Sequence, residues 1–200
     1  ESFHKTYVEE GIKKFVSVSS SKYQLFFKRY SKYKDINFLI NESTNCFEHM
    51  QNISLKSKAD YIMFLHDDDL FGKELLIKNF EILKAKKPIA ISSRPTFINF
   101  ESKKYSGLQY KYEEKIYKRN LYFSLAEYFV PFLRPVFFPT TVFKNQVLKE
   151  YFAKNNQRMG VHEDARIIIY FISKGNFLEN MMNNLYFYRW HDNQSANYKD

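Results

Sequence analysis

The sequence predicts an α/β fold in which helices flank a mixed, mostly parallel sheet. In the first 100 residues, short segments of strand character alternate with segments whose apolar residues recur at helical spacing. This alternation is typical of parallel sheets covered by helices. With 200 residues, of which 44% are hydrophobic, the chain can bury a substantial core, so we expect one domain.

The first half contains four predicted helices and four predicted strands. Segment 15–19 alternates apolar and polar residues as a half-buried strand does, whereas 73–86 has helical spacing and ends before Pro88. Proline disfavours helical backbone in the residue before it, which explains that end. The predicted helices are 3–14, 22–33, 46–58 and 73–86, and the predicted strands are 15–19, 36–40, 61–65 and one that begins at 89.

The second half is less regular. Residues 101–120 are polar, charged and tyrosine-rich, which predicts a loop. Residues 121–138 are aromatic and contain two prolines; they form either a core helix that breaks at proline or a docking surface for an acceptor or a membrane. We predict helices at 144–154 and 163–174, the second ending at Gly175, and a final strand at 184–190.

Composition excludes several classes of protein. The single cysteine, Cys46, excludes an internal disulfide and a cysteine-rich zinc module, and it fits a reducing compartment such as the cytoplasm. Only five glycines are present, and none forms a Walker or dinucleotide-binding motif. No apolar stretch approaches the roughly 18 residues of a membrane-spanning helix, and the first residues do not resemble a signal peptide. The formal charge of +9 favours anionic partners.

Three consecutive carboxylates, Asp67 to Asp69, follow the predicted strand at 61–65. Adjacent carboxylates repel one another, whereas a hard divalent cation neutralises them and can also hold the phosphates of a ligand. In α/β sheets, ligands bind beyond the carboxyl ends of the strands, where this triplet is expected to lie. We therefore predict a metal-diphosphate site there.

Two further segments contain reactive side chains. Glu163 and Asp164 begin the predicted helix at 163–174, where they either complement the helix dipole or supply a general base. Residues 188–195 leave the last predicted strand and include Arg189 and His191. This segment is either a plain strand end or, beside a metal, a source of a metal ligand and a phosphate contact.

Together these segments resemble the family 2 glycosyltransferases of the GT-A fold, which build bacterial capsule, lipopolysaccharide and related polysaccharides. Residues 61–69 look like that family's strand and DXD motif, and 162–164 look like its Glu-Asp element. Residues 188–195 resemble the tail that closes over the diphosphate, and 41–45 fit an asparagine-containing link. The register of the DXD motif stays open, since either Asp67 or His66 can occupy its first position.

The resemblance implies a Rossmann-like GT-A sheet in one domain, with a nucleotide-sugar-binding half at 1–100 and an acceptor-binding half at 101–200. The chain starts after the position of the family's first strand, so we expect that strand to be lacking, in a fragment or a shortened variant. The implied reaction is inverting, metal-dependent transfer of a hexose-type sugar from a nucleotide-diphosphate sugar to a hydroxyl of a glycan or lipid-linked acceptor.

The resemblance also implies roles for individual residues. Asp164 would be the catalytic base, supported by Glu163. Mn²⁺ or Mg²⁺ would be held by Asp68, Asp69 and His191. The residues implied to contact the donor are Asp67, Asp68, Arg189 and Asn45.

Other functions remain open beside this enzyme. A catalytically degenerate relative would act as a sugar-binding or scaffold protein. Binding of nucleic acid leaves the acidic triplet unexplained, and a metal-dependent phosphodiesterase would need a second cluster of ligands; we expect neither. We expect a cytoplasmic protein that can associate peripherally with the inner face of the bacterial membrane.

Overall fold

A computed structural model describes most of the chain. The described residues are 13–19, 24, 27–28, 36–42, 45–66, 69–72, 74–99, 101–104, 115–130, 135–155, 162–182 and 185–189. They belong to two compact units, one within 1–58 and one within 59–200. The predicted division into a donor half and an acceptor half stays a prediction.

Among its described residues, the first unit contains two parallel strands and the helix that follows them. β1 (Lys14–Ser19) pairs with β2 (Ile36–Asn41), and α3 (Cys46–Lys56) follows. Side chains join the helix to both strands: Ser17 Oγ lies 2.7 Å from His49 Nδ1, and Asn52 Nδ2 donates to Asn41 Oδ1 at 3.1 Å. These elements confirm the strands predicted at 15–19 and 36–40 and the helix at 46–58. The helices predicted at 3–14 and 22–33 lie almost entirely outside the described residues.

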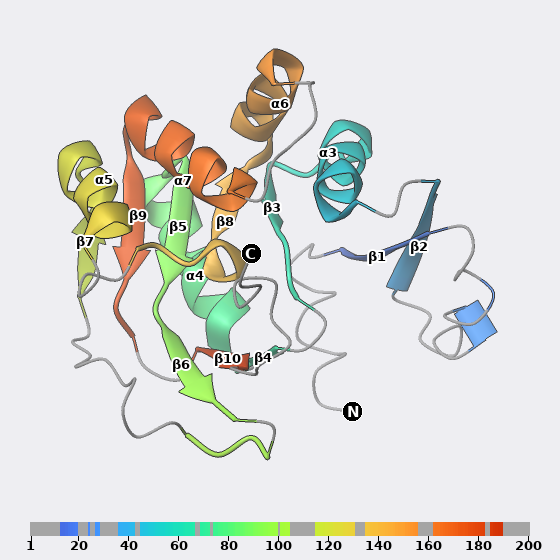
Figure 1. The fold of residues 1–200 in the computed structure, drawn as a ribbon, viewed down its shortest axis with the longest axis horizontal. Helices are drawn as coiled ribbons and strands as arrows, with labels where there is room; N and C mark the ends of the chain where they lie inside the picture. Colours follow the sequence, from blue (N-terminus) through green and yellow to red (C-terminus); the bar gives the residue numbers. More distant parts are fainter. Residues whose placement is uncertain are drawn as a thin grey trace. The chain divides into compact units, whose positions relative to one another are not determined.

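The second unit is built on a five-stranded mixed sheet (Figure 1). Its strands, in spatial order, are β3 (Tyr61–Met63), β8 (Val142–Lys144), β5 (Ala90–Ser93), β9 (Phe177–Asn180) and β7 (Ile116–Lys118). β5 and β9 are parallel, whereas β8 is antiparallel to both of its neighbours and β7 is antiparallel to β9. β3, β5 and β9 therefore run in the same direction.

Helices cover both faces of this sheet. Because successive side chains of a strand point to opposite faces, paired residues form rows that belong to one face. One row packs against Leu83 of α4 (Glu74–Lys86) and consists of Met63, Val142, Ile91 and Leu178. The row next to it lies on the opposite face and consists of Ile62, Phe143, Ala90 and Phe177.

The second face is covered by α7 (Glu163–Lys174), since the Phe143 and Phe171 rings meet edge to face with centroids 4.9 Å apart. α7 also contacts α5 (Leu121–Phe129), α6 (Asn145–Lys154) and the short 3-10 helix η3 (Phe138–Thr140). Phe143 and Phe171 are fully buried, as are Ile167 and Ile168 of α7. This side of the sheet therefore holds a continuous apolar core.

The second unit also contains a three-stranded sheet, two of whose strands follow β5 and β9 along the chain. Its order is β4 (Leu70–Phe71), β10 (Tyr186–Arg189) and β6 (Pro95–Ile98), with β10 antiparallel to β4 and parallel to β6. β6 follows β5 after the single residue Arg94, and β10 follows β9 after a short connection. Leu75 of α4 packs with Leu185 and Tyr186 beneath this sheet.

The predicted fold class, a mixed sheet flanked by helices, is confirmed. The predicted elements at 61–65, 73–86, 144–154, 163–174 and 184–190 are present with slightly different ends, as β3, α4, α6, α7 and β10. Antiparallel pairs are more numerous than βα alternation indicates. β7 arises from a segment predicted as a loop, and Val142 and Phe143 of β8 belong to no predicted element. Among the described residues, no helix is long and apolar enough to cross a membrane.

Candidate functional site

The carboxyl ends of three parallel-running strands define one edge of the five-stranded sheet. Met63, Ile91 and Leu178 lie in the same row of β3, β5 and β9, so the residues that follow them emerge at the same edge. This edge is where α/β sheets bind ligands. The predicted acidic triplet follows β3 there. Asp67 and Asp68 lie outside the described residues, and Asp69 is described.

The Asp69 side chain is almost fully buried and is held by β10. It is 2% exposed. Oδ1 accepts a hydrogen bond from the backbone N–H of Arg189, and Oδ2 accepts one from the Tyr186 hydroxyl, both at 2.7 Å. The Nδ1 atom of His66 lies 3.8 Å from Oδ2. These contacts join the acidic segment to a strand more than a hundred residues later in the chain.

The Arg189 side chain extends from β10 to the loop after β6. Its Nη1 donates to the carbonyl oxygen of Asn99 at 2.9 Å, and its Nη2 lies 3.4 Å from Ser102 Oγ. Arg189 therefore contacts the acidic segment through its backbone and the β6 loop through its guanidinium group. His191, the third predicted metal ligand, lies outside the described residues, so its position stays a prediction.

The first residue of α7, Glu163, is fully buried. Its carboxylate accepts hydrogen bonds from the Tyr151 hydroxyl of α6 and from Arg166 Nη1, the latter at 3.1 Å. Burial, reinforced by the charge of Glu163 and the hydrogen bond to it, raises the pKa of Tyr151 above the ordinary value of 10.0. Tyr151 thus stays protonated and donates to Glu163, which fixes the start of α7 against α6.

Asp164, the predicted catalytic base, is exposed. Its Oδ1 accepts the N–H of Ala165 at 2.7 Å, a contact that satisfies one of the free amides in the first turn of the helix. Burial and, secondarily, the charge of Asp164 raise the pKa of Tyr128 in α5. Asp164 therefore lies close enough to α5 to influence a side chain there.

The connection between α7 and β9 orients the start of the helix. Gly175 ends α7 with a positive φ of 126°, and only one further residue precedes β9. A helix that packs on a sheet and enters a strand through so short a connection must run back along that strand. The first turn of α7 therefore lies toward the carboxyl end of β9, the same edge of the sheet from which Asp69 emerges.

An aromatic cluster connects the end of β3 with α7. Phe64, the residue after β3, stacks on Phe138 with ring centroids 6.0 Å apart. Phe138 contacts Phe143 at 5.1 Å, and Phe143 contacts Phe171 of α7 at 4.9 Å. The cluster gives a rigid, dry base beneath the two segments that carry the predicted acidic residues.

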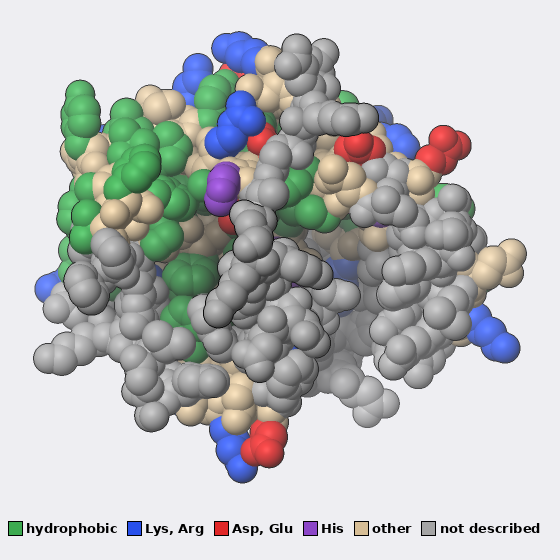
Figure 2. Space-filling view, viewed as in Figure 1, with side chains coloured by type: hydrophobic (Ala, Val, Ile, Leu, Met, Phe, Trp, Pro, Cys, Tyr) green, Lys and Arg blue, Asp and Glu red, His purple; other side chains and the backbone are tan. Residues whose placement is uncertain are grey.

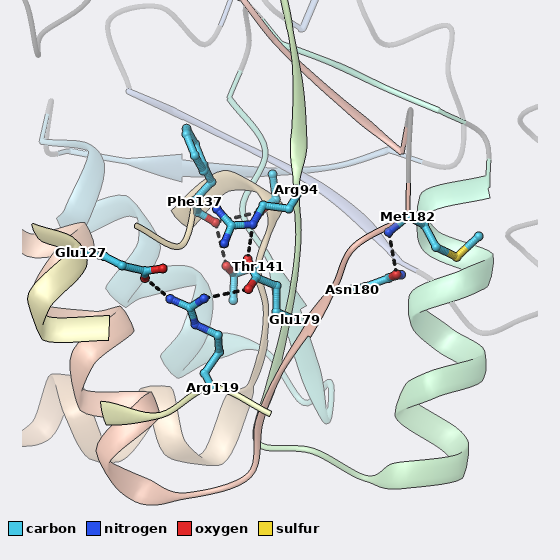
Figure 3. A network of polar contacts seen from close by, with 9 residues as sticks. Arg94, Arg119, Glu127, Phe137, Thr141, Glu179, Asn180 and Met182 are labelled. Atoms are coloured by element: carbon cyan, nitrogen blue, oxygen red, sulfur yellow. Dashed lines mark hydrogen bonds and ion pairs between the residues drawn. The ribbon is translucent and has the colours of Figure 1, made fainter. Parts of the chain in front are cut away.

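A buried ion network lies near the carboxyl ends of β5 and β9 (Figure 3). Glu179 of β9 pairs with Arg94 Nε at 2.5 Å and with Arg119 Nη1 at 2.8 Å, and Arg119 Nη2 also pairs with Glu127 of α5. All four residues are less than a tenth exposed. Burial lowers the pKa of Arg119, and the neighbouring Glu179 opposes that effect. Two positive and two negative charges thus compensate one another in the core.

This network was not among the predicted features. A signal exists in retrospect, since Glu179 and Arg94 each interrupt a short run of residues that are otherwise apolar or small. Such a charge is rarely buried unless it is paired. The sequence alone does not identify the partners, because Arg119 and Glu179 are 60 residues apart.

Asn45, which is predicted to contact the donor, caps a helix in the structure. Asn45 belongs to the first unit, where its side chain accepts the N–H of Phe47 at 2.9 Å and caps α3. In the part of the chain that is described, no group of three His, Cys, Asp or Glu side chains is arranged to hold a metal ion. The metal-ligating and donor-binding roles of Asp67, Asp68, Asp69, Arg189, His191 and Asn45, and the catalytic roles of Glu163 and Asp164, stay predictions.

Comparison with known proteins relates the chain to others through its fold. No protein-family model and no curated protein matches the sequence. Among solved structures, S. aureus TarS 1–349 in complex with UDP-GlcNAc superposes with a TM-score of 0.66, at 10% identity over 94% of this chain and 52% of that one. TarS 1–349 without that ligand gives 0.63 at 11% identity, over 88% and 51%.

The complex of TarS 1–349 with UDP gives a TM-score of 0.59 at 13% identity, over 90% of this chain and 52% of that chain. This chain therefore spans about half the length of the TarS structures that it matches. At such low identity the similarity concerns the fold, and it agrees with the GT-A type α/β architecture that the sequence predicts.

Proposed function

We propose that this chain is a glycosyltransferase domain that moves a sugar from a nucleotide-diphosphate sugar to a hydroxyl of a glycan or lipid-linked acceptor. The similarity of nearly its whole length to TarS, which binds UDP-GlcNAc in one of the matched structures, carries the proposal. The emergence of the acidic segment and the first turn of α7 at one edge of the sheet supports it, because ligands of α/β sheets bind at such an edge.

In the proposed reaction, Asp164 is the general base. It accepts the proton of the acceptor hydroxyl while that oxygen forms a bond to the anomeric carbon of the donor. The bond from this carbon to the diphosphate breaks, and the nucleoside diphosphate leaves with the electron pair. Attack opposite to the leaving group inverts the anomeric configuration. The exposure of Asp164 supports this role, since a base must reach its substrate.

In the same proposal, Asp68, Asp69 and His191 hold Mn²⁺ or Mg²⁺, and Asp67, Arg189 and Asn45 contact the donor. The metal would supply positive charge that stabilises the leaving diphosphate. The residue types fit such a cation, since carboxylate oxygens are the ligands that hard divalent ions prefer. Glu163 supports the site by fixing the start of α7.

Two substitutions and one metal titration test the proposal. Asp164→Asn should lower release of UDP from UDP-GlcNAc by about 10²–10⁴-fold, the usual contribution of a general base, and leave UDP affinity by calorimetry unchanged. The matched control is Asp60→Asn, which neutralises an exposed carboxylate outside the site. Preserved turnover in Asp164→Asn would rule out the base. Equal UDP affinity with and without Mn²⁺ would contradict a metal-bridged donor.

A second candidate is a catalytically degenerate sugar-binding or scaffold protein. Two predicted acidic residues, Glu163 and Asp69, already accept hydrogen bonds from neighbouring side chains or backbone, as structural carboxylates do. A thermal-shift screen of nucleotide sugars with Mn²⁺, followed by assays of nucleotide release for every sugar that binds, separates the two. Binding without release or transfer would favour the degenerate protein.

A further inference from the structure

In α5, polar side chains are buried and aromatic side chains are exposed, the opposite of an ordinary amphipathic helix. Its buried side chains include Ser124, which is fully buried, and Glu127, which is 5% exposed. Its exposed side chains are aromatic: Tyr122 and Phe129 are 81% exposed and Phe123 is 52% exposed. A helix in a globular protein normally turns its apolar stripe inward. The outward face of α5 is therefore apolar, and Phe123 alone of its three rings has a described contact with the ion network, with the Arg119 Cζ atom 5.8 Å from the ring centroid.

The buried ion network explains the reversal. Glu127 pairs with Arg119 inside the protein, and the Asn120 side chain accepts the N–H of Phe123 at 3.2 Å and caps the helix. Residues 124 and 127 lie on one side of a helix, so burying them fixes its rotation. Tyr122 and Phe129, seven positions apart, then share the opposite side. The aromatic residues face outward because the ion pair holds the polar side inward.

This aromatic face of α5 consists of Tyr122, Phe123, Phe129 and Val130, the last being 41% exposed. In Figure 2, hydrophobic side chains gather over the part of the molecule where Figure 1 shows α5. At roughly 200 Å² for each aromatic side chain, the three rings expose about 400 Å². A typical stable protein interface needs about 800 Å² from each partner, so the face is small for a dimer.

Charge favours an anionic partner. In residues 115–130, all of which are described, the exposed charged side chains are Lys115 and Lys118, and no exposed carboxylate is present. On the neighbouring α7, the exposed Asp164 and Arg166 carry opposite charges. The whole chain has a net charge of +9. Exposed aromatic side chains next to basic residues are typical of surfaces that bind anionic lipid headgroups. A glycan would need polar partners among the rings, but Phe123, Phe129 and Val130 offer no side-chain hydrogen-bonding group.

We propose that the aromatic face of α5 docks this protein on a bilayer that contains anionic lipids. This inference goes beyond the proposed transferase activity and does not depend on it. The nine residues of α5 extend only about 14 Å, less than half of the roughly 30 Å of a bilayer core. The helix therefore lies in the plane of the lipid headgroups, with Tyr122 and Phe129 inserted between acyl chains and the lysines near the phosphates.

Vesicle sedimentation with the full chain tests the docking. The wild-type protein should bind vesicles of phosphatidylcholine and phosphatidylglycerol more tightly than vesicles of phosphatidylcholine alone. The double variant Tyr122→Ser/Phe129→Ser should bind about 100-fold more weakly, because burial of each aromatic side chain contributes about tenfold and the two factors multiply. Both side chains are exposed, so the variant should fold normally. The control Leu55→Ser removes a half-exposed leucine of α3 and should bind as the wild type does.

A second measurement locates the contact. The chain already contains Trp190, so both probes are introduced in a Trp190→Phe background. There, the tryptophan of Phe129→Trp should be quenched by brominated lipids, whereas that of Leu55→Trp should not. Three results would overturn the proposal. The wild type binds neither kind of vesicle, the double variant binds as tightly as the wild type, or the tryptophan at position 55 is quenched while that at position 129 is not. Concentration-dependent dimerisation, or retention on immobilised glycan, that is abolished in the double variant while vesicle binding persists would assign the face to that partner instead.

Discussion

Glu179 compensates two buried guanidinium groups, so its replacement by glutamine should strongly destabilise the protein. The carboxylate lies 2.5 Å from Arg94 and 2.8 Å from Arg119, and it is 3% exposed. Glu179→Gln changes the net charge of the network from zero to +1 and leaves Glu127 to compensate both cations. Removing one partner of a buried ion network costs about 3–5 kcal/mol. That is a large part of the about 5–15 kcal/mol that stabilises a typical domain.

Urea unfolding followed by circular dichroism measures this loss. The matched control is Glu101→Gln, which removes the same charge from a pair with Lys103 at 2.7 Å. Both side chains of that pair are more than half exposed, so the control should cost about 0–1 kcal/mol. If the two variants differ by less than about 1 kcal/mol, burial does not determine the strength of the network, and the reasoning fails.

Two further predictions concern a hydroxyl and a helix cap. Tyr151→Phe removes a donor to the buried Glu163 and should cost about 1–3 kcal/mol at neutral pH. The folded protein holds the Tyr151 proton more tightly than the unfolded chain, so that contribution is full below pH 10.0 and is lost as the pH rises above it. Above pH 10.0, the urea midpoint should fall less steeply with pH in Tyr151→Phe than in the wild type. The same slope in both proteins would contradict a buried, protonated Tyr151 that donates to Glu163. Asn45→Ala should destabilise α3 by about 1 kcal/mol, whereas Asn45→Asp should retain the cap. Amide hydrogen exchange in α3 measures the difference, and equal protection in both variants would argue against the cap.

The elements that were predicted correctly carry their signal locally. α7 has apolar residues at helical spacing, of which Ile167, Ile168, Phe171 and Ile172 are buried, and a glycine at its end that adopts positive φ. β9 was not predicted, because a four-residue segment that contains glutamate and asparagine does not look like a central strand. It is stable there since arginines from two distant parts of the chain neutralise Glu179.

The candidate site follows the same pattern. Its position beyond a strand and at the start of a helix could be predicted, because both depend on local periodicity. The difference between Glu163, which is fully buried, and Asp164, which is exposed, could not be predicted. Neighbouring helical residues point about 100° apart, and the packing of Tyr151 from α6 decides which of them turns inward. The contacts of Asp69 likewise depend on β10.

β10 lies at the centre of the three-stranded sheet and supplies both described donors to the Asp69 carboxylate. A version of the protein truncated after Asn180 would keep all five strands of the larger sheet. It would nevertheless leave β4 and β6 without the strand between them and Asp69 without the Tyr186 hydroxyl and the Arg189 amide. Shortening this chain from its carboxyl terminus therefore disturbs the acidic segment before it removes any strand of the main sheet.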